Sequence, residues 1–169
     1  MKWTVAALTE FVQRLMSKSN PMKPAFRAYK TGTSANVTGD GTGYTVAYNA
    51  VLYDQHGDYD NSTYTFTAPV TGKYLFTTVN YTTSGARDHT TWQLDFITSN
   101  RNLLAYQIKD SSVIAMTEWC VNGSLVCDMD AGDTASVRLV VSGGTKDVNA
   151  IGDYGSGGNS CVFTGILLT

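Results

Sequence analysis

Short apolar-rich runs of β type dominate the chain from Ala25 onward. The runs are rich in Val, Thr and Tyr, and Gly, Asn and Asp separate them, which is typical of β-strands joined by turns. No helical pattern interrupts the series, so the sequence predicts an antiparallel β-sandwich. The clearest strand candidates span 46–53, 63–68, 73–82, 90–98, 102–108, 112–121, 124–129, 134–141 and 161–168.

We interpret Asn122-Gly123 as a two-residue hairpin turn between the runs 112–121 and 124–129. In such a hairpin Cys120 faces Leu125 and not Cys127, which argues against a disulfide between the two cysteines. The chain has three cysteines, and their spacing is not typical of a metal or redox site. We therefore expect Cys120, Cys127 and Cys161 to be reduced.

Residues 3–18 have a different pattern, and the spacing predicts an amphipathic helix. Apolar side chains recur every three or four residues and form one stripe that includes Leu8, Phe11, Val12 and Leu15. Pro21 ends this helix, because a proline disfavours helical conformation in the residue before it. The chain thus divides into an N-terminal helix and linker, 1–23, and a β-sandwich domain, 24–169.

The apolar stripe has three interpretations: an anchor that docks on another protein, a short trimeric coiled-coil stalk, or a helix that folds back on its own sandwich. We favour the anchor or the stalk. Glu10 and Arg14 interrupt the apolar run at the N-terminus, so we expect no signal peptide. Without one, the four glycosylation sequons should be unused; they lie at Asn36, Asn61, Asn80 and Asn122.

A set of aromatic and turn residues matches the C1q-domain signature at every interval: Tyr48, Asp54, Tyr59, Phe66, Gly72, Tyr74 and Phe76. Two positions depart from the pattern, since Tyr48 stands where Phe is usual and Thr78 stands where Phe or Tyr is expected. Phe163-Thr164-Gly165-Ile166-Leu167 is similar to the ending of the family, Phe-Ser-Gly-x-Leu, and Pro24-Ala25-Phe26 to its beginning. The sequence from 24 to 169 therefore resembles the C1q/TNF-like domain family.

The resemblance implies a jelly-roll sandwich of about ten strands that forms a tight homotrimer, binds proteins or ligands through its outer loops and is not an enzyme. The signature residues, together with Phe163 and Gly165, are then structural. Strand periodicity agrees for Tyr74 and Phe76, which should point into the core while Thr77 and Val79 point away from it.

Composition limits the partners. The formal net charge is −2, and only 15% of residues are charged, below the roughly 25% of an average soluble domain. The basic residues are scattered, which argues against nucleic acid, and no apolar run is long enough to span a membrane. Uncharged, hydroxyl-rich surfaces often meet other protein surfaces.

Candidate chemistry is sparse. His56 and His89 are the two histidines, and neither has a catalytic partner nearby in sequence, so we expect both to be solvated loop residues. No catalytic or cofactor motif is present, and we expect no cofactor. Asp54, Asp58 and Asp60 are weak candidates for calcium, but their spacing lacks the pattern of a known calcium loop. Asp128, Asp130 and Asp133 are weaker still, and turn-forming carboxylates are the default in both cases.

Our leading hypothesis is a non-enzymatic, homotrimeric structural protein of a bacteriophage virion. It would decorate (cement) the capsid or form a fibre, with residues 1–20 bound to a capsid or other virion protein and the sandwich exposed. The exposed sandwich would stabilise the shell or contact a host glycan or surface protein. The alternative is a secreted, lectin-like recognition protein of the C1q type. The alternative predicts an extracellular location and a glycan on Asn80 or Asn61.

Overall fold

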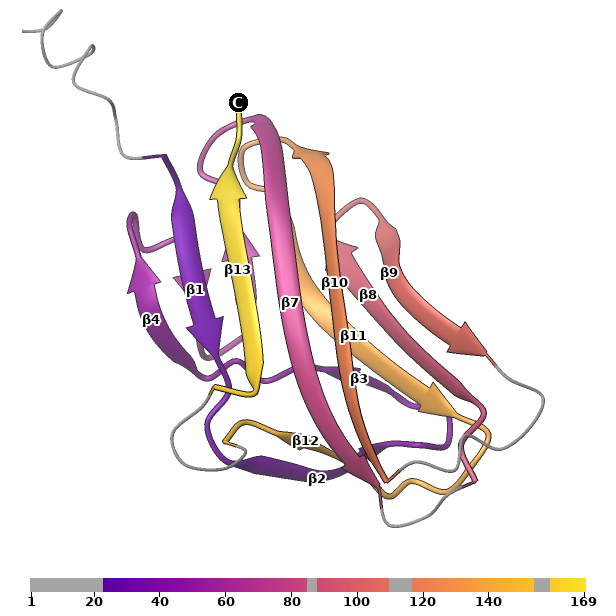
Figure 1. Cartoon of the computed structure of the whole chain (residues 1–169). Helices are drawn as coiled ribbons and strands as arrows, with labels where there is room; N and C mark the ends of the chain where they lie inside the picture. Colours follow the sequence, from indigo (N-terminus) through magenta and orange to yellow (C-terminus); the bar gives the residue numbers. More distant parts are fainter. Residues whose placement is uncertain (1–22, 85–87, 110–116, 154–158) are drawn as a thin grey trace, which may run out of the picture.

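The computed structural model describes residues 23–84, 88–109, 117–153 and 159–169, and these residues contain only strands, turns and loops (Figure 1). The helix predicted for 3–18, with its apolar residues Leu8, Phe11, Val12 and Leu15, lies outside the described residues. The all-β class is confirmed for the described residues from Lys23 to Thr169.

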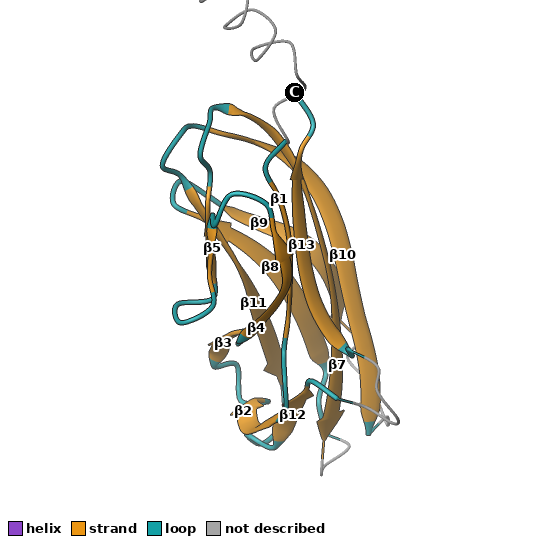
Figure 2. Cartoon of the chain, turned by 90° about the vertical axis from the view of Figure 1, so that its left-hand side faces the viewer, coloured by secondary structure: helices purple, strands orange, loops and turns teal. Residues whose placement is uncertain are grey.

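Two antiparallel sheets pack face to face, and we call them sheet A and sheet B. Sheet A has the order β2-β12-β7-β13-β1-β4, and β10 pairs with β7 as well; sheet B has the order β5-β6-β11-β8-β9, and β3 pairs with β11. In Figure 2 the strands β13, β7 and β10 of sheet A lie to one side of β5, β8 and β11. The strands are β1 (Ala25–Tyr29), β2 (Thr33–Thr38), β3 (Gly43–Thr45), β4 (Ala50–Asp54), β5 (Tyr59–Asp60), β6 (Thr65–Thr67), β7 (Gly72–Ser84), β8 (Thr91–Thr98), β9 (Asn102–Lys109), β10 (Glu118–Met129), β11 (Thr134–Ser142), β12 (Val148–Ile151) and β13 (Cys161–Leu167).

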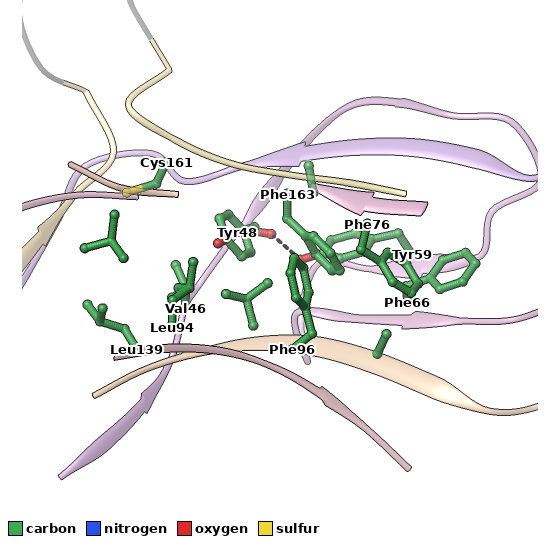
Figure 3. Packing of buried hydrophobic residues seen from close by; sticks show 14 of the residues in the cluster. Val46, Tyr48, Tyr59, Phe66, Phe76, Leu94, Phe96, Leu139, Cys161 and Phe163 are labelled. Atoms are coloured by element: carbon green, nitrogen blue, oxygen red, sulfur yellow. Dashed lines mark hydrogen bonds between the residues drawn. The ribbon is translucent and has the colours of Figure 1, made fainter. Parts of the chain in front are cut away.

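Aromatic side chains fill one half of the space between the sheets (Figure 3). Phe26 stacks on Phe66 with ring centroids 4.8 Å apart and meets Phe163 edge to face at 4.9 Å. Gly165 makes this packing possible, because a Cβ there would lie 2.8 Å from a ring carbon of Phe76. Val46, Leu94 and Leu139 continue the core toward the other end.

The hairpin predicted at Asn122-Gly123 is wrong. β10 runs through both residues without a break and pairs with β7 from Glu118, opposite Thr83, to Met129, opposite Gly72. Gly123 serves close packing rather than a turn, because a Cβ on it would come within 2.7 Å of the Ala105 Cβ on β9. A glycine in a strand often marks such a close approach.

Several short strands were not among the predicted runs. β2, β3, β5 and β12 carry mixed or polar residues and contribute two to six residues each. The predicted run 46–53 becomes strand only from Ala50 onward, although Val46 and Tyr48 are fully buried. Strand β6 ends at Thr67, two residues before Pro69, as expected for a residue that cannot donate a ladder hydrogen bond.

The first and last described residues lie at the same end of the sandwich. The Lys23 ammonium donates to the Leu168 carbonyl at 2.6 Å, and the Lys73 amide donates to the Thr169 carbonyl at 2.9 Å. β2 and β12 lie at the opposite end (Figure 1). Any segment that precedes Lys23 therefore leaves the domain at the end away from β2 and β12.

Candidate assembly surface

On the face of sheet A that points away from the core, Lys73, Glu118 and Asp128 lie near the ends of β7 and β10, and Arg27 is the charged residue of the central rows. Along β7 the inward residues Tyr74, Phe76 and Thr78 are buried, whereas Thr77 is partly exposed and Val79 is 41% exposed. This is the two-residue alternation expected of a strand with one buried face. The predicted orientation of Tyr74, Phe76, Thr77 and Val79 is therefore confirmed.

Strand register arranges this outward face into rows that cross several strands. An apolar row contains Val126, Leu75, Ile166 and Ala25, on β10, β7, β13 and β1. A neighbouring polar row contains Ser124, Thr77, Thr164, Arg27 and Tyr53, on β10, β7, β13, β1 and β4. The hydroxyl and apolar side chains together make a surface that can be desolvated without burying many charges.

Exposed apolar side chains gather on sheet A and on its edges. Val126 on β10 is 54% exposed and Ile166 on β13 is 39% exposed. At the other edge, β4 exposes three consecutive residues: Val51 at 37%, Leu52 at 59% and Tyr53 at 42%. Exposed apolar side chains clustered in this way mark interaction surfaces, whereas single ones are ordinary.

The outward face of sheet B satisfies its own polar groups. Asp95, only 2% exposed, accepts hydrogen bonds from Arg138 Nη2 at 2.8 Å and from Gln93 Nε2 at 2.9 Å. Gln107 Nε2 in turn donates to Gln93 Oε1 at 3.1 Å. Sheet A, and not sheet B, is therefore the better candidate for assembly.

The signature residues lie in the core and at the turn that supports it. Tyr48 is fully buried, and its hydroxyl lies 2.7 Å from Thr78 Oγ1 and donates to Asn80 Oδ1 at 2.7 Å. The Tyr59 hydroxyl donates to the Tyr48 carbonyl at 3.1 Å. Thr78, where the family pattern expects an aromatic residue, thus serves as a partner for the extra hydroxyl of Tyr48.

The carboxylates of Asp54 and Asp60 organise the β4–β5 and β5–β6 turns, whereas Asp58 Oδ2 is buried without a hydrogen-bond partner among the described residues. The Asp54 carboxylate accepts from the amides of Gly57, Asp58 and Tyr59 at 3.1, 3.1 and 2.9 Å. Asp60 accepts from the amide and hydroxyl of Ser62 at 2.8 and 2.6 Å, and these bonds lower its pKa to about 2. Burial, and secondarily the Asp54 charge, raises the pKa of Asp58.

Asp128, Asp130 and Asp133 also lie in turn and edge positions, around an open cleft of about 520 Å³ that Thr71, Lys73 and Arg101 help to line. Asp128 pairs with Arg101 at 2.9 Å, and Asp133 accepts from the Ser99 hydroxyl and the Asp130 amide at 2.7 and 2.9 Å. Within the described residues, no group of three His, Cys, Asp or Glu side chains is placed to hold a metal ion.

The prediction for the histidines is right for His56, which is exposed, and wrong for His89, which is only 1% exposed. His89 Nδ1 lies 3.3 Å from Ser84 Oγ, and Nε2 lies 3.1 Å from the Thr145 carbonyl and 3.2 Å from Asp147 Oδ1. Three loops converge on it, because Gly39 also approaches the ring: a Cβ there would lie 2.9 Å from Nε2.

Ser84, His89 and Asp147 are residue types that occur in hydrolase triads. Here the Ser84 hydroxyl donates to Asp147 Oδ1 at 3.2 Å, and the serine is 7% exposed. The cluster ties the β7–β8 and β11–β12 loops together.

All three cysteines are free thiols. Cys120 and Cys127 lie on the same strand at an odd separation, so their side chains point to opposite faces; Cys120 is exposed and Cys127 is buried. Burial raises the pKa of the Cys161 thiol to about 11. The expectation that Cys120 and Cys127 are not bonded to each other holds, for a different reason than the predicted hairpin.

Asn80 cannot carry a glycan in the folded domain. Its side chain is 1% exposed, accepts from Tyr48 and donates from Nδ2 to Thr78 Oγ1 at 3.0 Å. Asn36, Asn61 and Asn122 are exposed. In the part of the chain that the structure describes, no helix is long and apolar enough to cross a membrane.

Comparison with known proteins identifies the fold. The model of the C1q domain family matches residues 25–168. The globular domain of zebrafish complement 1qA superposes with a TM-score of 0.58 at 21% identity, over 87% of this chain and 98% of that one. Two TNF-like structures are also similar: Eiger TNF from S. frugiperda (TM-score 0.56, 15% identity, 87% and 93% covered) and murine APRIL (0.56, 10%, 86% and 99%). No curated protein sequence is significantly similar to this chain.

Proposed function

Because this chain belongs to the C1q domain family, whose domains are non-enzymatic binding or structural modules that form homotrimers, we propose that it is a homotrimeric structural protein of a virion. In this proposal it decorates the capsid or forms a fibre, and sheet A is the face through which the three copies associate. It is made in the host cytoplasm and resides on the virion surface.

The outward face of sheet A carries the assembly part of the proposal. Its apolar row exposes Val126 and Ile166, and Val79 is exposed on the far side of the neighbouring polar row. Burial of apolar area stabilises association by roughly 25 cal/mol per Å² before the costs of association are subtracted. Thr77 and Thr164 in the neighbouring row can hydrogen-bond across the contact without the desolvation cost of a charge.

The virion part of the proposal rests on the N-terminal sequence and on the thiols. The predicted apolar stripe of Leu8, Phe11, Val12 and Leu15 would dock on a capsid or other virion protein. Lys23 leaves the sandwich at the end away from β2 and β12, so an anchored trimer would point that far end outward (Figure 1). Free thiols suit synthesis in a reducing compartment.

Removal of residues 2–20 tests the anchor. The shortened chain should remain folded and lose binding to the particle that the full chain decorates, in a co-sedimentation assay with purified particles. A matched variant, Leu8→Asp with Leu15→Asp, should lose binding as well, since both changes place a charge in the stripe. Particle binding that survives the deletion would defeat the anchor assignment.

Intact mass spectrometry of the natural protein separates the proposal from the secreted alternative. The virion protein should have the mass of the unmodified chain. A glycan on Asn61 would support the secreted recognition protein, and burial of Asn80 removes the other site that this alternative predicted.

A further inference from the structure

Arg27 is a cation on the outward face of sheet A, away from the charged ends of β7 and β10. It lies on β1 in the polar row, between Thr164 and Tyr53. Its Nε is buried without a hydrogen-bond partner, and its guanidinium makes no ion pair with the residues that the structure describes. It lines a hollow of about 260 Å³ together with Val79, Val162 and Thr164.

A second hollow, of about 500 Å³, lies on the other side of β7 at the same level. Tyr106, Asn122 and Ser124 line it, and within the described residues the side chains of these three make no hydrogen bond. Ser124 belongs to the same cross-strand row as Arg27. One side of the face thus carries a buried donor without a partner, and the other side carries exposed hydroxyl and amide groups that can accept a hydrogen bond.

Rotational symmetry brings these two sides together. Three copies that face a common axis parallel to β7 meet through opposite edges, so the β1–β4 edge of one copy contacts the β10 edge of the next. Such a rotation preserves height along the axis, and residues of one row stay level with each other. We propose that Arg27 of one copy enters the hollow of its neighbour and donates hydrogen bonds to Ser124 and Asn122 there. This inference rests on the proposed trimer.

Hydrogen bonds from Arg27 to the neighbouring copy are energetically better than burial of Arg27 without acceptors. A guanidinium buried on assembly without acceptors would oppose association strongly. Charge-assisted hydrogen bonds are stronger than neutral ones, and Tyr106 offers its ring as a further surface for a guanidinium. Arg is also enriched among the residues that dominate interface affinity. Tyr53, beside Arg27 on the edge strand, would pack against the same β10 edge.

Cross-linking tests the pairing of the two edges directly. Tyr53 and Ser124 are level with each other but on opposite edges, four strand spacings apart, or about 19 Å. In Tyr53→Cys with Ser124→Cys, made in a Cys120→Ser background, a bismaleimide linker shorter than that separation cannot bridge one copy. The linker should therefore join neighbouring copies of the double variant into covalent trimers on a denaturing gel. The two single variants should give no covalent trimer. If the double variant gives none either, the proposed pairing of the two edges is wrong.

Substitution of Arg27 tests its role. Arg27→Ala should weaken the trimer at least tenfold in a dilution series followed by light scattering, and Arg27→Lys should fall between it and the native chain. Lys146→Ala, an exposed cation on the β11–β12 loop, is the matched control and should leave the affinity unchanged. Circular dichroism should show all three variants folded, because none of these side chains lies in the core.

The outcomes separate the two proposals. A native chain that stays monomeric at every concentration refutes the trimer itself. A native trimer whose affinity does not change in Arg27→Ala refutes only the role of Arg27.

Discussion

The hydroxyl of Tyr48 provides a test of how the core is held together, because the C1q pattern usually has Phe at this position. The hydroxyl contacts Thr78 Oγ1 and donates to Asn80 Oδ1, both at 2.7 Å, in a fully buried site. Tyr48→Phe keeps the ring and removes only the oxygen. Asn80 Oδ1 then loses the one donor that the structure gives it.

The expected cost follows from these contacts. A buried polar group left without a partner costs about 1–3 kcal/mol, so we expect Tyr48→Phe to lower the free energy of unfolding by about 2 kcal/mol. For a domain of this size that corresponds to a fall in Tm of roughly 4–8 °C. Combining it with Asn80→Leu should cost less than the sum of the two single changes, since both partners are then apolar.

Urea denaturation at fixed protomer concentration is the assay, because assembly makes the apparent stability concentration-dependent. Tyr64→Phe is the matched control: Tyr64 is half-buried, and its hydroxyl makes no hydrogen bond with the described residues. It should stay within about 0.5 kcal/mol of the native chain. Equal stability of Tyr48→Phe and the native chain would refute the assignment of the buried network.

Three further predictions follow from the polar groups. Asp95→Asn should destabilise the domain by about 1–3 kcal/mol in urea, because Arg138 loses its carboxylate while remaining partly hydrated at 34% exposure; an unchanged midpoint would contradict the ion pair. Iodoacetamide should alkylate Cys161, whose pKa burial raises to about 11, only after unfolding; peptide mass spectrometry reads this out, and early labelling of Cys161 would be inconsistent with its burial. The bonds from Ser62 lower the pKa of Asp60 from its usual 3.8 to about 2. The stabilisation from this site is therefore present above about pH 4 and lost as the pH falls toward 2. Asp60→Asn should reduce the loss of unfolding free energy between about pH 4 and pH 2. The same pH dependence in the variant and the native chain would argue against a role of Asp60.

The fold could be predicted where local pattern and long-range pairing agree. The series of short β-type runs predicts a sandwich, and the spacing from Tyr48 to Phe76 implies one through its resemblance to the C1q signature. The alternation predicted along β7 also appears in the structure. The hairpin prediction at Asn122-Gly123 was wrong because a glycine that favours a turn can also allow a neighbouring strand to pack closely. The local sequence does not distinguish a glycine in a turn from a glycine at a close strand contact. The short strands β2 and β12 were missed because they depend on pairing with neighbouring strands that lie far away in the sequence.

The assembly surface was less accessible to sequence reasoning. Composition predicted a surface poor in charge, but Arg27, Tyr53 and Ser124 share a row only through four strand pairings between distant segments. His89 was misplaced for a related reason. Its burial depends on Gly39 and Asp147, which lie 50 residues before it and 58 residues after it, and nothing in the adjacent sequence indicates that these loops meet.

Light scattering on the full-length chain beside a version that starts at Lys23 tests the central claim most directly. If sheet A drives assembly, both chains should have the mass of a trimer at micromolar concentration. A full-length trimer with a monomeric short chain would show that the N-terminal segment is the trimer stalk and would contradict assembly through sheet A. Two monomeric chains would contradict the trimer altogether.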